Sequence, residues 1–187
     1  MRKVCLGFAM LAMAGVAQAA PVTGKDAKAL LFSPKGTSVE VIKHSFLTDA
    51  DLKVIAEVAG QQKYYAAIAV SPDEGLLVEA TVAGANFHDT DSASAFALAG
   101  CEAKRKGETP CVIVAVVRPK GWEARALQLS VEATEIARKE YLSTPDPKAM
   151  ATSAGTGQWA IGAGAEAAVA ACATKSGAPD CATVLLD

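Results

Sequence analysis

Residues 93–117 read ASAFALAGCEAKRKGETPCVIVAVV, and residues 164–187 read GAEAAVAACATKSGAPDCATVLLD. In both stretches an alanine-rich run ends in a cysteine, a basic residue and a glycine follow, and a second cysteine opens an apolar run. Upstream of each, an apolar stretch leads into a serine and a turn that ends in glycine, at residues 67–75 and 149–157. Because order and chemistry both recur, the sequence indicates an internal duplication.

Each copy has the pattern strand, strand, helix, strand. In the first copy, residues 64–70 and 76–82 are β-prone runs, and residues 71–75 between them have turn chemistry. Residues 111–117 show no polar alternation, which is typical of a central strand that is covered on both faces. The intervening helix, capped by Thr90 or Asp91, has one apolar face made of Ala93, Phe96, Ala97, Gly100 and Cys101.

Four cysteines follow residue 19, and four thiols allow three pairings. The local pair, a helix cysteine with the cysteine of the next strand, is the one that recurs in both copies. We therefore predict the disulfides Cys101–Cys111 and Cys172–Cys181, each worth roughly 2–3 kcal/mol in the chain-entropy model. A zinc site is disfavoured, because structural zinc prefers Cys-x-x-Cys spacings that are much shorter than these.

The N-terminus has the pattern of an export signal. Arg2 and Lys3 precede an uncharged, mostly apolar run over residues 4–16, and Ala17-Gln18-Ala19 offers the small residues that a signal peptidase needs. We predict cleavage after Ala19 and a periplasmic or secreted protein, a setting in which disulfides persist. The apolar run is too short to span a bilayer, and we expect no membrane span after cleavage.

The composition gives no sign of nucleic-acid binding. The net charge is −2, and loss of residues 1–19 removes two basic and no acidic residues, which leaves a charge of −4. A mild negative charge provides no electrostatic attraction for nucleic acid or an anionic membrane. Apolar residues make up 51% of the chain but aromatic residues only 5%, so we expect a core packed from small side chains.

The predicted fold is α+β, with two ββαβ-like repeats that each hold a helix-to-strand disulfide and that share one core. The predicted parts are a signal peptide (1–19), an N-terminal hairpin and helix (20–60), the first repeat (61–120), a connecting helix and linker (121–147) and the second repeat (148–187).

Local signals place the elements outside the repeats. Residues 29–32 and 39–43 suggest the hairpin, and Thr48 with Asp51 resembles a capping box for a helix that runs to Gly60. Ser130 is expected to cap the connecting helix, and the prolines of residues 143–147 mark a linker. Residues 123–129 are consistent with either strand or helix.

One cluster, Asn86-Phe87-His88-Asp89-Thr90-Asp91, could carry acid–base chemistry. In a catalytic interpretation, His88 is a general base oriented by Asp89 or Asp91. In the structural interpretation, which we favour, the acids cap the following helix and His88 is a solvated loop residue. A calcium loop beginning at Asp89 is excluded, because Ser94 and Gly100 stand where glycine and glutamate are required.

The stretch Gly162-x-Gly164-x-x-Ala167, followed by a strand that ends in Asp187, matches a dinucleotide fingerprint. The equivalent stretch of the first copy, residues 92–94, has no glycine, and nicotinamide cofactors are scarce outside the cytoplasm. Small residues for close helix–sheet packing explain the pattern better. We expect no nucleotide, no metal and no other cofactor.

The sequence favours binding over catalysis. Trp122 and Trp159 are candidate partner contacts, since tryptophan is enriched at interface hot spots. The alternative, which we favour for each side chain taken alone, is burial under a loop. We expect a non-enzymatic exported protein that binds a protein partner in the envelope, for example as an inhibitor-like module. The alternative is a small periplasmic hydrolase or isomerase that uses His88 with Asp89 or Asp91.

Both copies, about half of the chain after residue 19, resemble a family of secreted bacterial domains of unknown function found in short exported alphaproteobacterial proteins, although the first copy departs from it with Leu76-Leu77 in place of Gln158-Trp159 and with a longer insert through His88. The resemblance is carried by residues 147–153 (PKAMATS), by Gly157-x-Trp159, by the alanine-rich helix with Cys172, and by Cys181-x-x-Val184. It implies an exported location and a paired-cysteine α/β repeat, but no activity.

Overall fold

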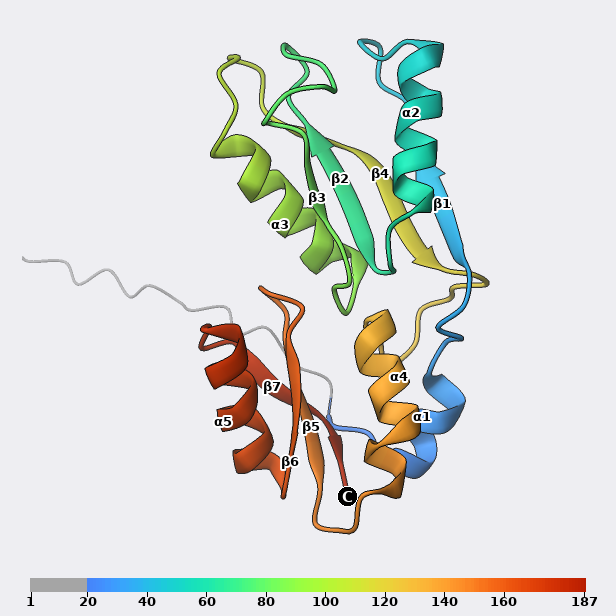
Figure 1. Cartoon of the computed structure of the whole chain (residues 1–187), viewed down its shortest axis with the longest axis vertical. Coiled ribbons are helices and arrows are strands. Elements are labelled where there is room, and N and C mark those ends of the chain that lie inside the picture. Colours follow the sequence, from blue (N-terminus) through green and yellow to red (C-terminus); the bar gives the residue numbers. More distant parts are fainter. Residues whose placement is uncertain (1–19) are drawn as a thin grey trace, which may run out of the picture.

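The structure is a computed structural model that describes residues 20–187, so the predicted signal peptide lies outside it. The described chain forms two lobes stacked along the long axis of the molecule (Figure 1). We define lobe 1 as residues 37–119, and lobe 2 as residues 20–31 together with 127–187. From residue 20 onward the chain therefore runs from lobe 2 to lobe 1 and back.

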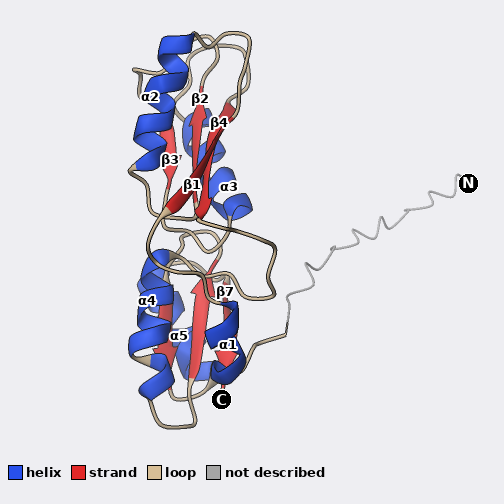
Figure 2. Cartoon of the chain, turned by 90° about the vertical axis from the view of Figure 1, so that its right-hand side faces the viewer, coloured by secondary structure: helices blue, strands red, loops and turns tan. Residues whose placement is uncertain are grey.

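Each lobe is a small antiparallel sheet covered by helices on both faces (Figures 1 and 2). Lobe 1 contains β1 (Thr37–Val41), α2 (Asp49–Gly60), β2 (Ala66–Val70), β3 (Val82–Gly84), α3 (Thr90–Glu102) and β4 (Val112–Pro119). Lobe 2 contains α1 (Gly24–Leu30), α4 (Val131–Lys139), the 3-10 turn η1 (Tyr141–Ser143), β5 (Ala149–Ser153), β6 (Trp159–Gly162), α5 (Ala165–Ser176) and β7 (Cys181–Leu186). The strand orders are β1-β4-β2-β3 and β6-β5-β7, which confirms the predicted α+β class.

The strand register confirms the duplication. In both lobes the first strand of the copy is central, with the second strand on one side and the last on the other: β3-β2-β4 and β6-β5-β7. The pairing of β2 with β4 shifts between Ile68 and Ala69, and that of β5 with β7 shifts between Met150 and Ala151. These two irregularities occupy the same position of the repeat, so residues 111–116 of lobe 1 correspond to residues 181–186 of lobe 2.

Both predicted disulfides are present. Cys101 of α3 is bonded to Cys111 beside β4, and Cys172 of α5 is bonded to Cys181 of β7. The Cα–Cα distances are 6.2 and 6.0 Å, within the usual range for a disulfide. Each bridge therefore attaches the helix on one face of a sheet to the strand that follows it.

Local capping signals account for the predicted helices. The Thr48 hydroxyl accepts from the Asp51 amide at 3.2 Å and the Asp51 carboxylate accepts from the Thr48 amide at 2.8 Å, the capping box that starts α2. Ser130 caps α4, as expected. The cap of α3 is Asp89, one residue before Thr90, because its carboxylate accepts from the amide and the hydroxyl of Ser92.

The N-terminal hairpin expected over residues 29–43 does not form. Residues Gly24–Leu30 are the helix α1, and β1 pairs with β4 instead of with a preceding strand. The Thr23 hydroxyl accepts from the Asp26 amide at 3.2 Å, and the Gly24 amide donates to the Asp187 carboxylate at 3.0 Å. A cap and a contact with the last residue of the chain therefore start a helix in this segment.

Two further segments differ from the sequence-based prediction. The second strand of the first repeat, expected over residues 76–82, begins only at Val82, and residues 76–81 form a bent loop in which the Thr81 hydroxyl donates to the Leu76 carbonyl at 2.6 Å. Residues 123–129, which were consistent with strand or helix, are neither. They form the irregular segment that returns the chain to lobe 2.

The buried apolar residues form separate clusters on the two faces of each sheet. Lobe 1 has one cluster beneath α2 and another beneath α3. Lobe 2 has one cluster beneath α1 and α4 and a smaller one beneath α5. The lobes meet at a small cluster of Phe32, Tyr64 and Tyr65 with Val131 packed against it, so the contact between the repeats is local where we expected a shared core.

Close helix–sheet packing explains the first glycine of the pattern that resembles a dinucleotide fingerprint, and the second, Gly164, has a positive φ of 94° at the start of α5. A Cβ atom on Gly162, the last residue of β6, would overlap the backbone of Ala167 and Ala168 in α5. Gly84 ends β3 at the equivalent position, and a Cβ atom there would lie 2.6 Å from the Ala93 carbonyl oxygen of α3. Each repeat thus has a glycine where its second strand passes under its helix.

Candidate functional site

His88 lies at the junction of the two lobes and is almost fully buried. It belongs to the loop before α3 in lobe 1, but both of its ring nitrogens contact lobe 2. The Ser130 amide donates to Nδ1 at 3.1 Å, and Nε2 lies 3.3 Å from the Gln158 carbonyl oxygen. Because Nδ1 accepts, the proton resides on Nε2, which donates to Gln158. The expectation of a solvated loop histidine is therefore wrong.

The surroundings of His88 keep its imidazole neutral. Burial lowers the pKa of His88 from 6.5 to about 4, and the Gln158 carbonyl and the Asp89 carboxylate only partly oppose this effect. Both ring nitrogens are engaged by backbone groups, so neither is available to accept a proton from a substrate. Through its hydrogen bonds with Ser130 and Gln158, His88 joins lobe 1 to lobe 2.

The acidic neighbours of His88 do not complete a catalytic set. Both carboxylate oxygens of Asp89 accept from Ser92, at 2.6 and 2.9 Å, and Asp91 is exposed in the first turn of α3. Neither orients the His88 ring through a hydrogen bond. The structure therefore brings His88 and Asp89 to one place but gives them structural partners.

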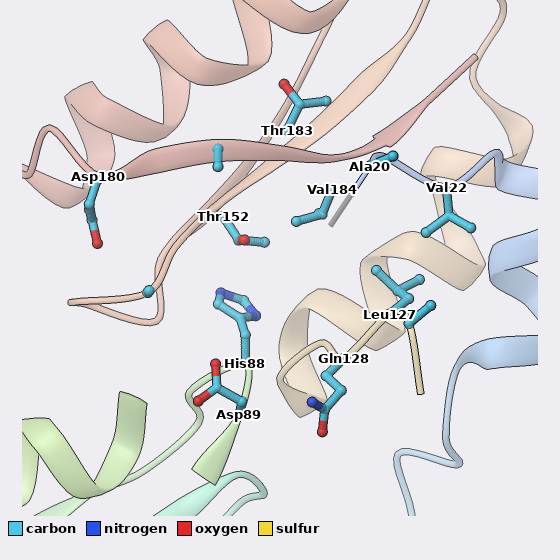
Figure 3. Close-up of a pocket in the computed structure, with 13 residues that line it drawn as sticks. Ala20, Val22, His88, Asp89, Leu127, Gln128, Thr152, Asp180, Thr183 and Val184 are labelled. Atoms are coloured by element: carbon cyan, nitrogen blue, oxygen red, sulfur yellow. The ribbon is translucent and has the colours of Figure 1, made fainter. Parts of the chain in front are cut away.

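A pocket of about 190 Å³ lies beside His88, between the lobes. Figure 3 shows the side chains of His88, Thr152 and Val184 directed toward a common space. Five segments line it: residues 20 and 22, residues 88–89, residues 126–128, residues 152 and 154, and residues 180 and 182–184. The sequence could not reveal this pocket, because its wall is assembled from segments that are far apart along the chain.

The charged side chains of the pocket lining are acidic. Asp89 and Asp180 are the charged residues of its lining, and no lysine or arginine of the described chain contributes to it. Burial alone would raise the pKa of Asp180, but hydrogen bonds from the Ser153 hydroxyl and the Gly155 amide outweigh burial and hold that pKa below its usual range. Asp180 is thus ionised at neutral pH.

The two candidate partner contacts lie in different places. Trp122 is 37% exposed, lies under the Arg118 guanidinium, and donates through Nε1 to the Gln128 side chain at 3.0 Å. Since Gln128 lines the pocket, Trp122 is linked to the pocket rim. Trp159 is half-buried against the core of lobe 2, with the Lys175 ammonium 4.1 Å from its ring centroid.

Residues 20–187 offer neither a metal centre nor a membrane-spanning helix. Within that range no group of three or more histidine, cysteine, aspartate or glutamate side chains is arranged to hold a metal ion. Within the same range no helix is long and apolar enough to cross a membrane.

Comparisons with protein-family models, with curated proteins and with solved structures found no match. The resemblance to a secreted bacterial domain family therefore stays a prediction, and the two lobes of the chain are best compared with each other.

Proposed function

We propose that this protein is an exported, non-enzymatic binding module that holds a partner protein at the junction of its two lobes. The compartment is supported by the sequence of residues 1–19 and by two disulfides that suit an oxidising environment. Of the two candidate tryptophan contacts, Trp122 supports this location, because it donates to Gln128 of the pocket lining.

The observation that carries the proposal is the pocket between the lobes. Its lining combines apolar residues such as Leu127 and Val184 with the acidic residues Asp89 and Asp180, and it includes part of β7, an edge strand of its sheet. A ligand seated there would contact both lobes at once. Apolar surface with a few oriented polar groups is the usual composition of a binding site.

The hydrolase or isomerase alternative receives less support from the geometry. It requires a free nitrogen on His88, whereas Ser130 and Gln158 engage both nitrogens. It also requires Asp89 or Asp91 to orient the ring, and neither does so.

The proposal is tested by affinity capture of the exported, disulfide-bonded protein from a periplasmic extract. Ala126 lines the pocket and is exposed, so Ala126→Trp fills the entrance without burying new volume in a core. Ala170 is an exposed alanine of α5 away from the pocket lining, and Ala170→Trp is the matched control. We expect one protein to be retained by the wild type and by Ala170→Trp but lost from Ala126→Trp. Equal recovery on all three baits would refute binding at the junction.

A further inference from the structure

The closed junction requires a neutral His88. The ring belongs to lobe 1, but its two nitrogens contact main-chain groups of lobe 2: Nδ1 accepts from the Ser130 amide at 3.1 Å, and Nε2 donates to the Gln158 carbonyl oxygen, 3.3 Å away. A second proton would reside on Nδ1, where it would face the Ser130 N–H, donor against donor. The imidazolium form therefore conflicts with the closed junction.

Separation of the lobes removes this conflict without unfolding either lobe. Each lobe has apolar clusters on both faces of its own sheet and a disulfide of its own. Phe87, next to His88, packs in the cluster beneath α3, so the loop that carries the imidazole stays anchored in lobe 1. The lobes themselves meet at the small cluster around Tyr64 and Tyr65. A local opening at the junction is therefore the smallest change that brings water to the ring.

We propose that protonation of His88 opens the junction between the folded lobes, and that this opening takes the junction pocket apart and releases the bound partner. The pocket is lost on opening because its lining comes from both lobes, with residues 88–89 from lobe 1 and residues 182–184 from lobe 2. The release rests on the proposed function, whereas the opening does not. The site therefore binds at neutral pH and releases in acid.

The charged groups around His88 act in opposite directions. The carboxylate of Asp89, on the same loop, and that of Asp180, on the loop before β7, favour the imidazolium. The α-amino group that the predicted cleavage after Ala19 places at Ala20, in the same pocket lining, opposes it. Burial is the largest effect and lowers the pKa of His88 to about 4 in the closed form, whereas exposure to water returns the pKa toward 6.5 in the open form.

Acid therefore favours the open form. Because the pKa of His88 is lower in the closed form, the closed junction is retained above pH 6.5. The ratio of closed to open forms falls between pH 6.5 and 4, by about 300-fold in total. The ion pair of Lys63 and Glu132 also crosses the junction, but Lys63 lowers the pKa of Glu132, so this pair stays ionised through most of that range.

Amide hydrogen exchange measures the opening even where the open form is rare. Exchange is followed residue by residue by NMR at pH 7, 6 and 5 and is corrected for the intrinsic rate at each pH. The reporters are the amides of Ser130 and Val131, which donate across the junction to acceptors in lobe 1. Their protection should fall about twentyfold between pH 7 and 5. The amides of Ile42 and Lys148 donate within lobe 1 and lobe 2, respectively, and should keep their protection.

The two histidines provide the matched variants. His88→Asn keeps an acceptor for the Ser130 amide but cannot be protonated, so the pH dependence at the junction should disappear. His44→Asn should retain it. Equal loss of protection within the lobes would indicate global unfolding and would overturn the opening, as would junction protection that is the same at pH 7 and 5. This comparison of amides decides the opening in the wild type even if a variant does not fold.

Release is tested on the partner captured from periplasmic extract at pH 7. It should elute at pH 5 from the wild type and from His44→Asn but stay on His88→Asn. Retention on the wild type at pH 5 would overturn the release. Absence of capture at pH 7 would overturn the proposed function, whereas the exchange measurement needs no partner and tests the opening separately.

Discussion

In each lobe, acidic side chains join two loops: the turn after the first strand of the repeat, and the loop between the helix and the last strand. In lobe 1 the acids lie on the turn after β2, whereas in lobe 2 the acid lies on the loop before β7. Asp73 accepts from the amide and hydroxyl of Thr109 at 2.8 and 2.7 Å, and Glu74 accepts from the Lys106 amide. In lobe 2, Asp180 before β7 accepts from the Ser153 hydroxyl and the Gly155 amide in the turn after β5, at 2.7 and 2.6 Å. Both lobes therefore have carboxylate hydrogen bonds between these two loops, but the loop that supplies the carboxylate differs between the lobes.

The different position of the acid in lobe 2 brings it to the junction of the lobes. The acids of lobe 1 are occupied at the far end of the molecule from the junction, but Asp180 also lines the junction pocket. The histidines differ in the same way: His44 completes the covered edge of β4, and His88 binds lobe 1 to lobe 2. His44 thus acts within lobe 1, whereas His88 connects lobe 1 to lobe 2. The following predictions test this contrast, beginning with the largest effect.

Acidification should weaken the protein through His88. Its folded pKa of about 4 lies below the ordinary value of 6.5, so the unfolded chain takes up the proton first as the pH falls. Stability is therefore retained above pH 6.5 and lost between pH 6.5 and 4, by roughly 3 kcal/mol in total. Urea denaturation at a series of pH values measures the loss.

His88→Asn and His44→Asn form the matched pair for this prediction. The asparagine side chain of the first variant can still accept from the Ser130 amide but does not titrate, so the slope between pH 6.5 and 4 should flatten. His44→Asn changes the other histidine and should keep the slope. If His88→Asn and the wild type lose stability in parallel, His88 is not the group that joins the lobes in neutral form.

Removal of either disulfide should destabilise the protein by roughly 2–3 kcal/mol, because the unfolded chain regains the entropy of an open loop. The two effects should be nearly equal, since the loops that the disulfides close have sequence separations of 10 and 9. The double variants are Cys101→Ala with Cys111→Ala, and Cys172→Ala with Cys181→Ala. Chemical denaturation of each measures the change in the free energy of unfolding. If only one of the two double variants lost stability, the two disulfides would contribute unequally even though the repeats share a fold.

The repeat made the central architecture predictable from sequence. It selected one disulfide pairing out of three and placed both disulfide-bonded helices, since these features depend on residues that are close along the chain. The helix α1 was missed because its first turn depends on Asp187, at the other end of the sequence. His88 was misplaced for the same reason, since its partners Ser130 and Gln158 are 42 and 70 residues away. Local patterns predict elements, whereas burial at a junction depends on contacts that no local pattern contains.

The paired glycines should respond alike. Gly84→Ala and Gly162→Ala each introduce a Cβ atom against helix backbone, and overpacking of this kind typically costs about 1–3 kcal/mol. Gly60 at the end of α2 has open space around its Cβ position, so Gly60→Ala should be neutral or slightly stabilising. Thermal unfolding of the three variants measures this. A neutral Gly162→Ala would contradict the close packing of β6 against α5 at this glycine.

The acids that connect these loops give the smallest and most specific effect. Asp180→Asn replaces a carboxylate that accepts two hydrogen bonds with an amide that can accept at only one end, and we expect a loss of about 1 kcal/mol at pH 7. The folded pKa of Asp180 is lowered, so its contribution is present above the unfolded pKa and disappears as the carboxylate is protonated. Urea denaturation should therefore show wild type and variant converging as the pH falls through that range. Asp73→Asn is the counterpart in lobe 1, and it should also reduce stability, because it disturbs the hydrogen bonds to Thr109. Asp180→Asn should in addition reduce capture of the proposed partner protein, because Asp180 lines the junction pocket and Asp73 does not.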